Sequence, residues 1–219
     1  MFDIFIVTYI PGMSWSHMDI NIRNNCFCMQ SFVSQLEWRP YGHLICTPVC
    51  LLAGASFLKG FSLSNEYVKQ IMNRSHALYL ECFASHNQPL KIQELYDLIP
   101  SGQFEFKEAA GMLLTKVESS EINAEDLIVM SLSELLRYAM EKKRRNNEKD
   151  TCCVIVTTMD HTTCFLVDRY TQKLQVFDPL PASLKQISLY TLEKSLAEQY
   201  GAQNASALFS AILLELKME

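Results

Sequence analysis

The sequence predicts an α+β fold, in which a helical first part packs on an antiparallel β-meander. Helix-type spacing of apolar residues dominates roughly 46–142, whereas three apolar, β-branched runs follow one another within roughly 152–180. Because the helices are grouped and do not alternate with the strands, a parallel βαβ sheet is not expected. A chain of 219 residues fits a single domain spanning 1–219.

Short apolar stretches and turn signals fill the first 45 residues. The opening MFDIFIVTYI predicts a strand that ends at Pro11-Gly12, since Asp3 interrupts the apolar run and no basic segment of a signal peptide accompanies it. Without a secretory signal, the eight cysteines are expected as free thiols in a reducing, cytoplasmic compartment.

The helical part is predicted to begin at Cys46–Pro48, in the segment CTPVCLLAGASFL. Thr47 is a favoured N-cap residue, and Pro48 at the first helical position loses no hydrogen bond there. Ser131 and Ser133 are the candidate caps of the last helix in this part. The further helices expected here are SNEYVKQIMNRSHALYLECF, KIQELYDLI, FKEAAGMLLTKV and SLSELLRYAMEKK.

The pattern changes after EKKRRNNEK, a basic run flanked by acids that is typical of a solvated loop or helix end. Strands are predicted at CCVIVTTM (152–159), TTCFLV (162–167) and KLQVFD (173–178). Two helices, LYTLEKSLAEQY and SALFSAILLELK, are expected to follow.

Charge and composition exclude several function classes. The net charge of −5 gives no support to nucleic-acid binding, and no apolar run approaches the roughly 20 residues that span a bilayer. The pairs Cys26/Cys28 and Cys152/Cys153 lack zinc-site spacing and are expected to be packing residues. We therefore expect a monomer without metal or cofactor.

Cys46 is the candidate nucleophile. A thiol at a helix N-terminus faces the positive end of the macrodipole, which favours the thiolate, although a buried packing cysteine can occupy the same position. Cys50 lies one turn further along the same face and is expected to point into the core, as is Cys164.

His161 and Asp178 are the candidate partners of this thiol. If the turn between the last two predicted strands centres near Tyr170, His161 falls opposite a residue near 179, so Asp178 can reach its ring. The carboxylate would orient the imidazole, which would take the thiol proton. Taken singly, each residue is equally typical of a turn.

These segments resemble papain-fold cysteine peptidases, most closely the viral tegument-type deubiquitinases of the herpesvirus large tegument protease group. Cys46-Thr-Pro-Val-Cys50 matches the Cys-x-x-x-Cys that opens the central helix of those enzymes. His161 and the phrase Phe177-Asp178-Pro179 match their His strand and Asp strand. The resemblance implies a papain-like fold and a catalytic triad of Cys46, His161 and Asp178.

The chain departs from this group around its expected oxyanion hole. The group usually has Gln directly before the nucleophile, where this chain has Ile45. Gln35 is the nearest match to an oxyanion-hole Gln about a dozen residues upstream, with a surface side chain as the alternative. Trp38 and Tyr41 are candidates for the wall of a substrate-tail channel, or else they belong to the core.

The resemblance also implies the substrate. It predicts hydrolysis of the (iso)peptide bond after the C-terminal Gly-Gly of ubiquitin or a ubiquitin-like modifier, with modified proteins as the partners. Another thiol enzyme on the same fold, such as a polyprotein protease, a transacylase or a deamidase, would use the same three residues. A non-catalytic ubiquitin-binding module is the third alternative, and it would be expected to lack a triad member.

Overall fold

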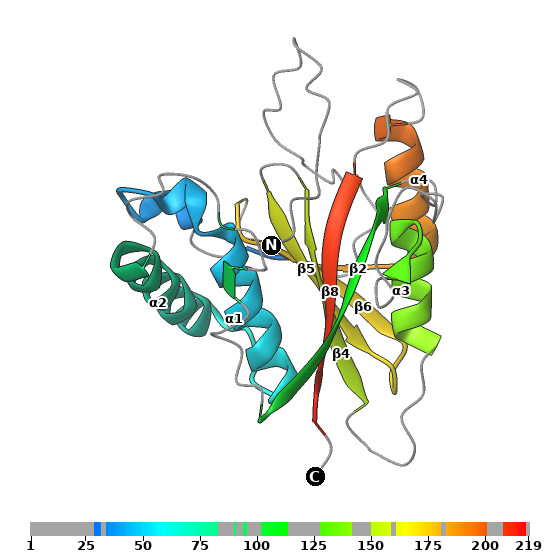
Figure 1. The fold of residues 1–219 in the computed structure, drawn as a ribbon, viewed down its shortest axis with the longest axis horizontal. Helices are drawn as coiled ribbons and strands as arrows, with labels where there is room; N and C mark the ends of the chain where they lie inside the picture. Colours follow the sequence, from blue (N-terminus) through cyan, green and yellow to red (C-terminus); the bar gives the residue numbers. More distant parts are fainter. Residues whose placement is uncertain are drawn as a thin grey trace.

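The computed structural model describes residues 29–31, 34–82, 90, 94–95, 102–113, 128–141, 150–158, 161–180, 183–200 and 208–217. In this part of the chain, a sheet of eight strands has helices on both faces (Figure 1). The strand order is β1-β7-β6-β5-β4-β8-β2-β3, and all neighbours are antiparallel except β2 and β3. The fold class is therefore α+β, as predicted.

The described elements have the following bounds. The strands are β1 (Met29–Ser31), β2 (Phe104–Met112), β3 (Ile128–Val129), β4 (Thr151–Thr157), β5 (Thr162–Asp168), β6 (Lys173–Asp178), β7 (Ser183–Ile187) and β8 (Leu208–Leu216). The helices are α1 (Cys46–Leu58), α2 (Asn65–Cys82), α3 (Leu132–Glu141) and α4 (Leu189–Tyr200), with short 3-10 helices η1 (Gln35–Glu37) and η2 (Gly42–Leu44).

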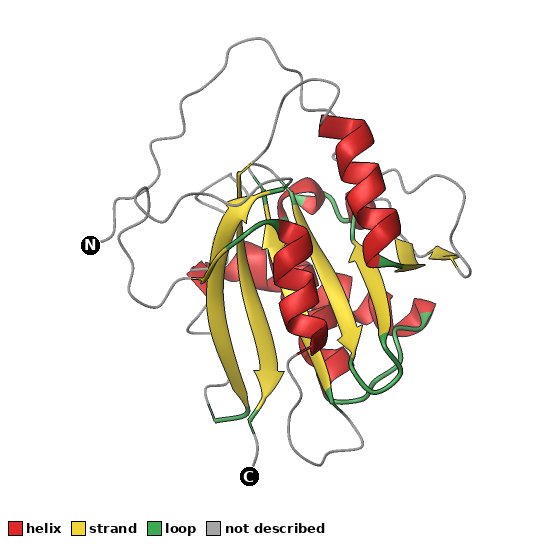
Figure 2. Ribbon diagram, turned by 90° about the vertical axis from the view of Figure 1, so that its right-hand side faces the viewer, coloured by secondary structure: helices red, strands yellow, loops and turns green. Residues whose placement is uncertain are grey.

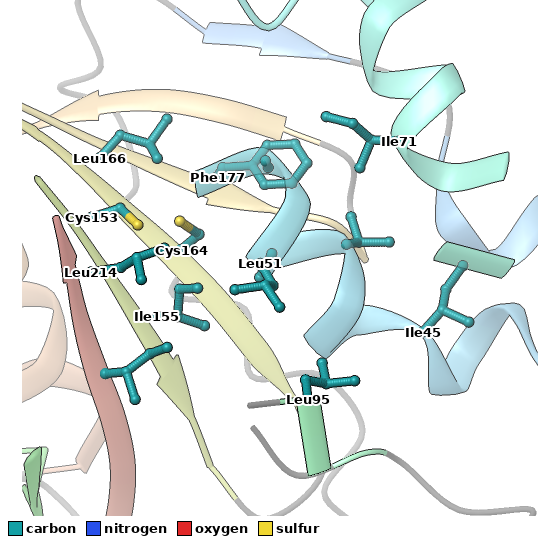
Figure 3. Packing of buried hydrophobic residues seen from close by; sticks show 14 of the residues in the cluster. Ile45, Leu51, Ile71, Leu95, Cys153, Ile155, Cys164, Leu166, Phe177 and Leu214 are labelled. Atoms are coloured by element: carbon teal, nitrogen blue, oxygen red, sulfur yellow. The ribbon is translucent and has the colours of Figure 1, made fainter. Parts of the chain in front are cut away.

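The sheet separates two hydrophobic cores. Successive side chains of a strand point to opposite faces, so Cys153 and Ile155 of β4 join the core beneath α1 and α2 (Figure 3). Val154 and Val156 of the same strand join the core beneath α3 and α4, which cover the other face of the sheet (Figure 2). Burial on both faces explains why the central strands are almost continuously apolar.

Helix α1 lies directly against β4 and β5, and Gly54 permits this close approach. A Cβ atom at Gly54 would lie 2.6 Å from Cys153 Sγ and 3.3 Å from Cys164 Sγ, which leaves no room for a larger side chain. The predicted inward orientation of Cys164 is confirmed, since its side chain is fully buried in the same core. This packing fixes the height of α1 above the sheet.

Arg169 joins three elements at the end of β5 opposite His161. Its buried guanidinium donates from Nε to the Ala139 carbonyl at the end of α3, at 2.5 Å. Nη1 donates to Asp150 Oδ1 at 2.7 Å, and Nη2 donates to Glu215 Oε1 of β8 at 2.6 Å. Two carboxylates and a carbonyl thus compensate the buried cation.

The predicted helices at 46–58, 64–83, 131–143 and 189–200 are confirmed as α1 to α4. Ser131 caps α3 in a capping box, because its Oγ accepts the Glu134 N–H at 3.4 Å while Glu134 Oε2 accepts the Ser131 N–H at 2.8 Å. The predicted strands at 152–159, 162–167 and 173–178 are confirmed as β4, β5 and β6. Strand β7 was not predicted.

Two predicted helices are strands. FKEAAGMLLTKV lies largely in β2 and SALFSAILLELK in β8, so the helical part is interrupted by a strand. The two strands pair with each other over nine residues each, from Phe104 opposite Leu216 to Met112 opposite Leu208. Pairing between such distant segments overrides the helix preference of their Ala, Leu, Glu and Lys residues.

The N-cap prediction for Thr47 is wrong. Helix α1 starts at Cys46, so Pro48 is its third residue and not its first as predicted, and Ile45 at the N-cap position forms no side-chain cap hydrogen bond. The Thr47 hydroxyl instead donates to the Leu90 carbonyl at 2.6 Å, so a tertiary contact takes the place of the cap. The strand predicted in residues 1–10, Cys26 and Cys28, and most of the helix predicted at 91–99 lie outside the described residues.

Candidate active site

Cys46 occupies the first turn of α1 and is almost completely buried, with 1 % of its surface exposed. Burial acts to raise the pKa of its thiol. Hydrogen bonds from the His161 side chain and from the Thr162 side chain and backbone, together with the positive charge of His161, outweigh that effect and lower the pKa below the ordinary thiol range. The first helical turn favours the thiolate as well.

His161 lies directly before β5, with its Nε2 2.9 Å from Asp178 Oδ1 at the end of β6. Burial acts to lower the pKa of the imidazole, but hydrogen bonds and charge interactions with Asp178 and Cys46 raise that pKa to about 10. Because Nε2 is engaged by Asp178, Nδ1 is the nitrogen left for the thiol. The site therefore favours a thiolate–imidazolium pair.

Asp178 has two roles in the structure. Its Oδ1 accepts the Nε2 proton of His161 and also the backbone N–H of Leu180 at 3.0 Å, which closes a turn at the end of β6. The predicted juxtaposition with His161 is confirmed, and so is the alternative of a turn aspartate. Cys164 lies opposite Phe177 in the β5–β6 ladder, one residue from the predicted register.

Gln35 lies beside this turn and is fully buried, so the alternative of a surface side chain is wrong. Its backbone N–H donates to the Pro179 carbonyl at 3.3 Å, and the neighbouring Ser34 hydroxyl donates to the Leu180 carbonyl at 2.6 Å. Among the residues that the structure describes, neither Oε1 nor Nε2 of Gln35 has a hydrogen-bond partner. A buried amide without hydrogen bonds destabilises the folded protein unless a ligand supplies those bonds.

Gly42 fixes the backbone of Gln35 from the other side. A Cβ atom at Gly42 would lie 2.3 Å from the Gln35 carbonyl oxygen and 3.4 Å from Leu36 Cα. Both contacts are with backbone atoms, which cannot rotate aside as a side chain can. Only glycine therefore allows η2 to pack against η1 at this distance.

Trp38 and Tyr41 attach the segment between η1 and α1 to helix α2. Trp38 Nε1 donates to Asn73 Oδ1 at 2.6 Å, and the rings of Tyr41 and Tyr79 pack with centroids 5.4 Å apart. His76 Nε2 also lies 2.6 Å from the Pro40 carbonyl oxygen. Both Trp38 and Tyr41 pack against the core, as the second alternative predicted, and their role in a substrate channel stays a prediction.

Thr162 is a site residue that the sequence reasoning missed. Its hydroxyl lies 2.8 Å from Thr47 Oγ1 and 3.1 Å from Thr157 Oγ1, and its carbonyl accepts the Cys50 S–H at 3.2 Å. The signal was present in the sequence, because strand alternation from Cys164 places Thr162 on the face beneath α1.

The described residues contain no group of three His, Cys, Asp or Glu side chains arranged to hold a metal ion. Five cysteines in this part of the chain are free thiols, namely Cys46, Cys50, Cys152, Cys153 and Cys164. None of the helices described here has the length and apolar character needed to cross a membrane.

A search of solved structures matches the chain to a viral ubiquitin-specific protease. That protein is encoded by the murine cytomegalovirus tegument protein M48, and its crystal structure contains a ubiquitin-based suicide substrate. The match has a TM-score of 0.60 at 16% sequence identity and covers 88% of this chain and 87% of the other. The likeness is one of fold. No protein-family model and no curated protein matches the sequence.

Proposed function

We propose that the chain is a thiol-dependent deubiquitinase, a single papain-like peptidase domain over 1–219 with Cys46, His161 and Asp178 as its catalytic triad. The observation that supports this most directly is the 2.9 Å hydrogen bond between His161 Nε2 and Asp178 Oδ1, combined with the effect of His161 in lowering the pKa of the Cys46 thiol. Cys46 is more than 100 residues from the other two in the sequence, and a thiol paired with a carboxylate-bound imidazole is the arrangement of an activated nucleophile.

The reaction follows from these positions. The Cys46 thiolate attacks the carbonyl carbon of the scissile bond, and the carbonyl oxygen becomes an oxyanion. His161 passes its Nδ1 proton to the leaving amine, which departs as the C–N bond breaks and leaves a thioester on Cys46. Water then attacks the thioester while His161 takes its proton as the general base. The C–S bond breaks, which releases the carboxylic acid and regenerates the thiolate–imidazolium pair.

Gln35 is the proposed oxyanion donor. Its Nε2 is buried and has no hydrogen-bond partner in the described part of the chain, and η1 lies beside the turn that follows Asp178. A donor that is already in place when negative charge develops on the oxygen stabilises the transition state without reorganisation. The oxyanion that forms when Cys46 attacks would thus accept a hydrogen bond from Gln35 Nε2.

The burial of the site favours a slender acyl group. Cys46 is 1 % exposed and His161 is 7 % exposed, so a substrate chain has to approach through a narrow opening. Glycine has no side chain and allows the closest approach of a backbone, which suits the Gly-Gly end of ubiquitin or a ubiquitin-like modifier. The ubiquitin-based substrate in the M48 structure supports the same assignment. A reactive thiolate is also suited to a reducing, cytoplasmic compartment.

The test is incubation with ubiquitin bearing a C-terminal electrophile, read as a mass shift of the intact protein. We expect an adduct with the unchanged protein, none with Cys46→Ala, and full labelling of Cys50→Ala, because Cys50 donates to the Thr162 carbonyl within the core. Labelling that survives Cys46→Ala would place the nucleophile elsewhere. A protein that binds ubiquitin without forming the adduct would be a binding module.

A further inference from the structure

Thr162 lies between the two cysteines of helix α1. It directly follows His161, its side chain is fully buried, and its carbonyl accepts the Cys50 S–H at 3.2 Å. Its hydroxyl is 2.8 Å from Oγ1 of Thr47, the residue after Cys46, and the Thr162 side chain is among the groups that lower the pKa of the Cys46 thiol. The hydroxyl therefore faces the first turn of α1 at the point where the nucleophile lies.

The direction of these hydrogen bonds can be worked out from the protons available. The Thr47 hydroxyl has one proton, which it donates to the Leu90 carbonyl at 2.6 Å. Thr47 Oγ1 is then an acceptor, so in the contact between the two threonines it is Thr162 that donates. Thr157 Oγ1, 3.1 Å away on β4, can in turn donate to Thr162.

The single proton of Thr162 is thus donated to Thr47 Oγ1, and the Cys46 sulfur, on the residue before Thr47, is the second acceptor at this turn of α1 that the Thr162 side chain affects. While Cys46 is a neutral thiol, its sulfur is a weak acceptor and the threonine oxygen is the better one. Once Cys46 loses its proton, the sulfur carries a full negative charge, and a hydrogen bond to an ionised acceptor is roughly twice as strong.

We propose that Thr162 is a further catalytic residue of the proposed deubiquitinase, whose hydroxyl turns from Thr47 to the Cys46 thiolate and holds that thiolate ready for attack. The inference rests on the proposed nucleophile but not on the identity of the substrate. It explains why a threonine is buried at this position with three hydroxyl or thiol neighbours, where an apolar side chain would fill the same space.

The test measures the pH dependence of Cys46 alkylation by iodoacetamide in the folded full chain, with the modified peptide identified by mass spectrometry. Thr162→Ser and Thr162→Ala both lose the methyl group and differ only in the hydroxyl. We expect Thr162→Ser to keep the alkylation midpoint of the unchanged protein, and Thr162→Ala to raise it by about one pH unit, which is the effect of losing one hydrogen bond to a charged group.

Two further variants complete the comparison. Thr162→Val keeps the shape of the side chain and should show the same upward shift, which provides a second reading if Thr162→Ala does not fold. Thr157→Val removes a hydroxyl of the same network that does not reach Cys46, and should leave the midpoint unchanged. Equal midpoints for Thr162→Ser and Thr162→Ala, or an equal shift in Thr157→Val, would overturn the inference.

This readout is independent of the substrate. Alkylation of Cys46 requires no ubiquitin, so a Thr162-dependent midpoint in a protein that does not react with the ubiquitin electrophile would refute the proposed substrate and support the role of Thr162. Reaction with the ubiquitin electrophile combined with a Thr162-independent midpoint would do the opposite.

Discussion

Replacing Asp178 by asparagine separates its two roles. In the structure, one carboxylate oxygen accepts both the His161 Nε2 proton and the Leu180 N–H. The Leu180 N–H requires an oxygen at that position, so it fixes the asparagine amide with Oδ1 toward both donors. The turn and the imidazole tautomer are then preserved, and only the negative charge is lost.

The size of the effect follows from the hydrogen bonds. A hydrogen bond to a charged group contributes about 1.5–3 kcal/mol, and one to a neutral group about 1 kcal/mol. Asp178→Asn should therefore stabilise the His161 imidazolium less by about 1.4 kcal/mol, which lowers kcat/KM about tenfold. Asp178→Ala removes the hydrogen bond to His161 and the one that closes the turn, and should lower kcat/KM about 10- to 100-fold. His161→Ala removes proton transfer itself and should abolish nearly all turnover.

The pH profile provides a second measure of the same change. His161 acts as an imidazolium with a pKa raised to about 10, so activity is present below that pH and is lost as the pH rises through it. Loss of the Asp178 charge lowers this pKa, and the alkaline limb of kcat/KM should move down by about one pH unit.

The assay is cleavage of a fluorogenic ubiquitin substrate across pH by the unchanged protein and the three variants. Full activity of Asp178→Ala would show that Asp178 is a turn residue only. An Asp178→Asn variant as inactive as His161→Ala would show that the amide does not keep the tautomer, and would refute the argument from the Leu180 N–H.

Three other predictions concern residues that hold the site and its frame. Gly42→Ala should lower kcat with little change in KM, because the added Cβ displaces the Gln35 carbonyl and with it the proposed oxyanion donor. In a Gln35→Ala background the same substitution should lower kcat much less, since the donor is already absent. Arg169→Ala should lower the free energy of unfolding by about 3–5 kcal/mol in urea, since it removes the cation that pairs with the buried Glu215 carboxylate and the partly buried Asp150 carboxylate. A loss below about 1 kcal/mol would contradict this. Ser131→Ala should lower the free energy of unfolding by about 1 kcal/mol, because it removes the capping box with Glu134. Ser133→Ala should leave that free energy nearly unchanged.

The candidate triad could be predicted because its parts are locally encoded. His161 and Asp178 belong to one hairpin, whose register depends on a short turn, and the prediction was within one residue of the observed pairing. The start of α1 at Cys46–Pro48 was predicted from Thr47 and Pro48, although the positions that these two residues were given in the first turn were wrong. The prediction that Cys46 lies beside this hairpin depended on the combination of the three residues and on the family resemblance, since no local sequence rule predicts the packing of α1 on β5.

Strands β2 and β8 could not be recognised for a related reason. β8 lies between β4 and β2 and is buried along most of its length, so it reads as a continuous apolar run that cannot be distinguished from a buried helix by periodicity. Its partner β2 is about 100 residues earlier in the chain, and that pairing leaves no local signal in either segment. Gln35 was similarly ambiguous, because its burial depends on contacts with the turn after Asp178.

The central position of β8 has a consequence for how the molecule is made. Residues 208–216 fill the gap between β4 and β2, so the sheet is divided into two separate parts until this segment is inserted. A nascent chain that has already exposed Cys46, His161 and Asp178 to the cell still lacks a continuous sheet to support α1. Because non-local strand pairing is slow, folding is expected to be completed only after Leu216 has left the ribosome. The proposed activity would then appear only after residues 208–216 have joined the two parts of the sheet.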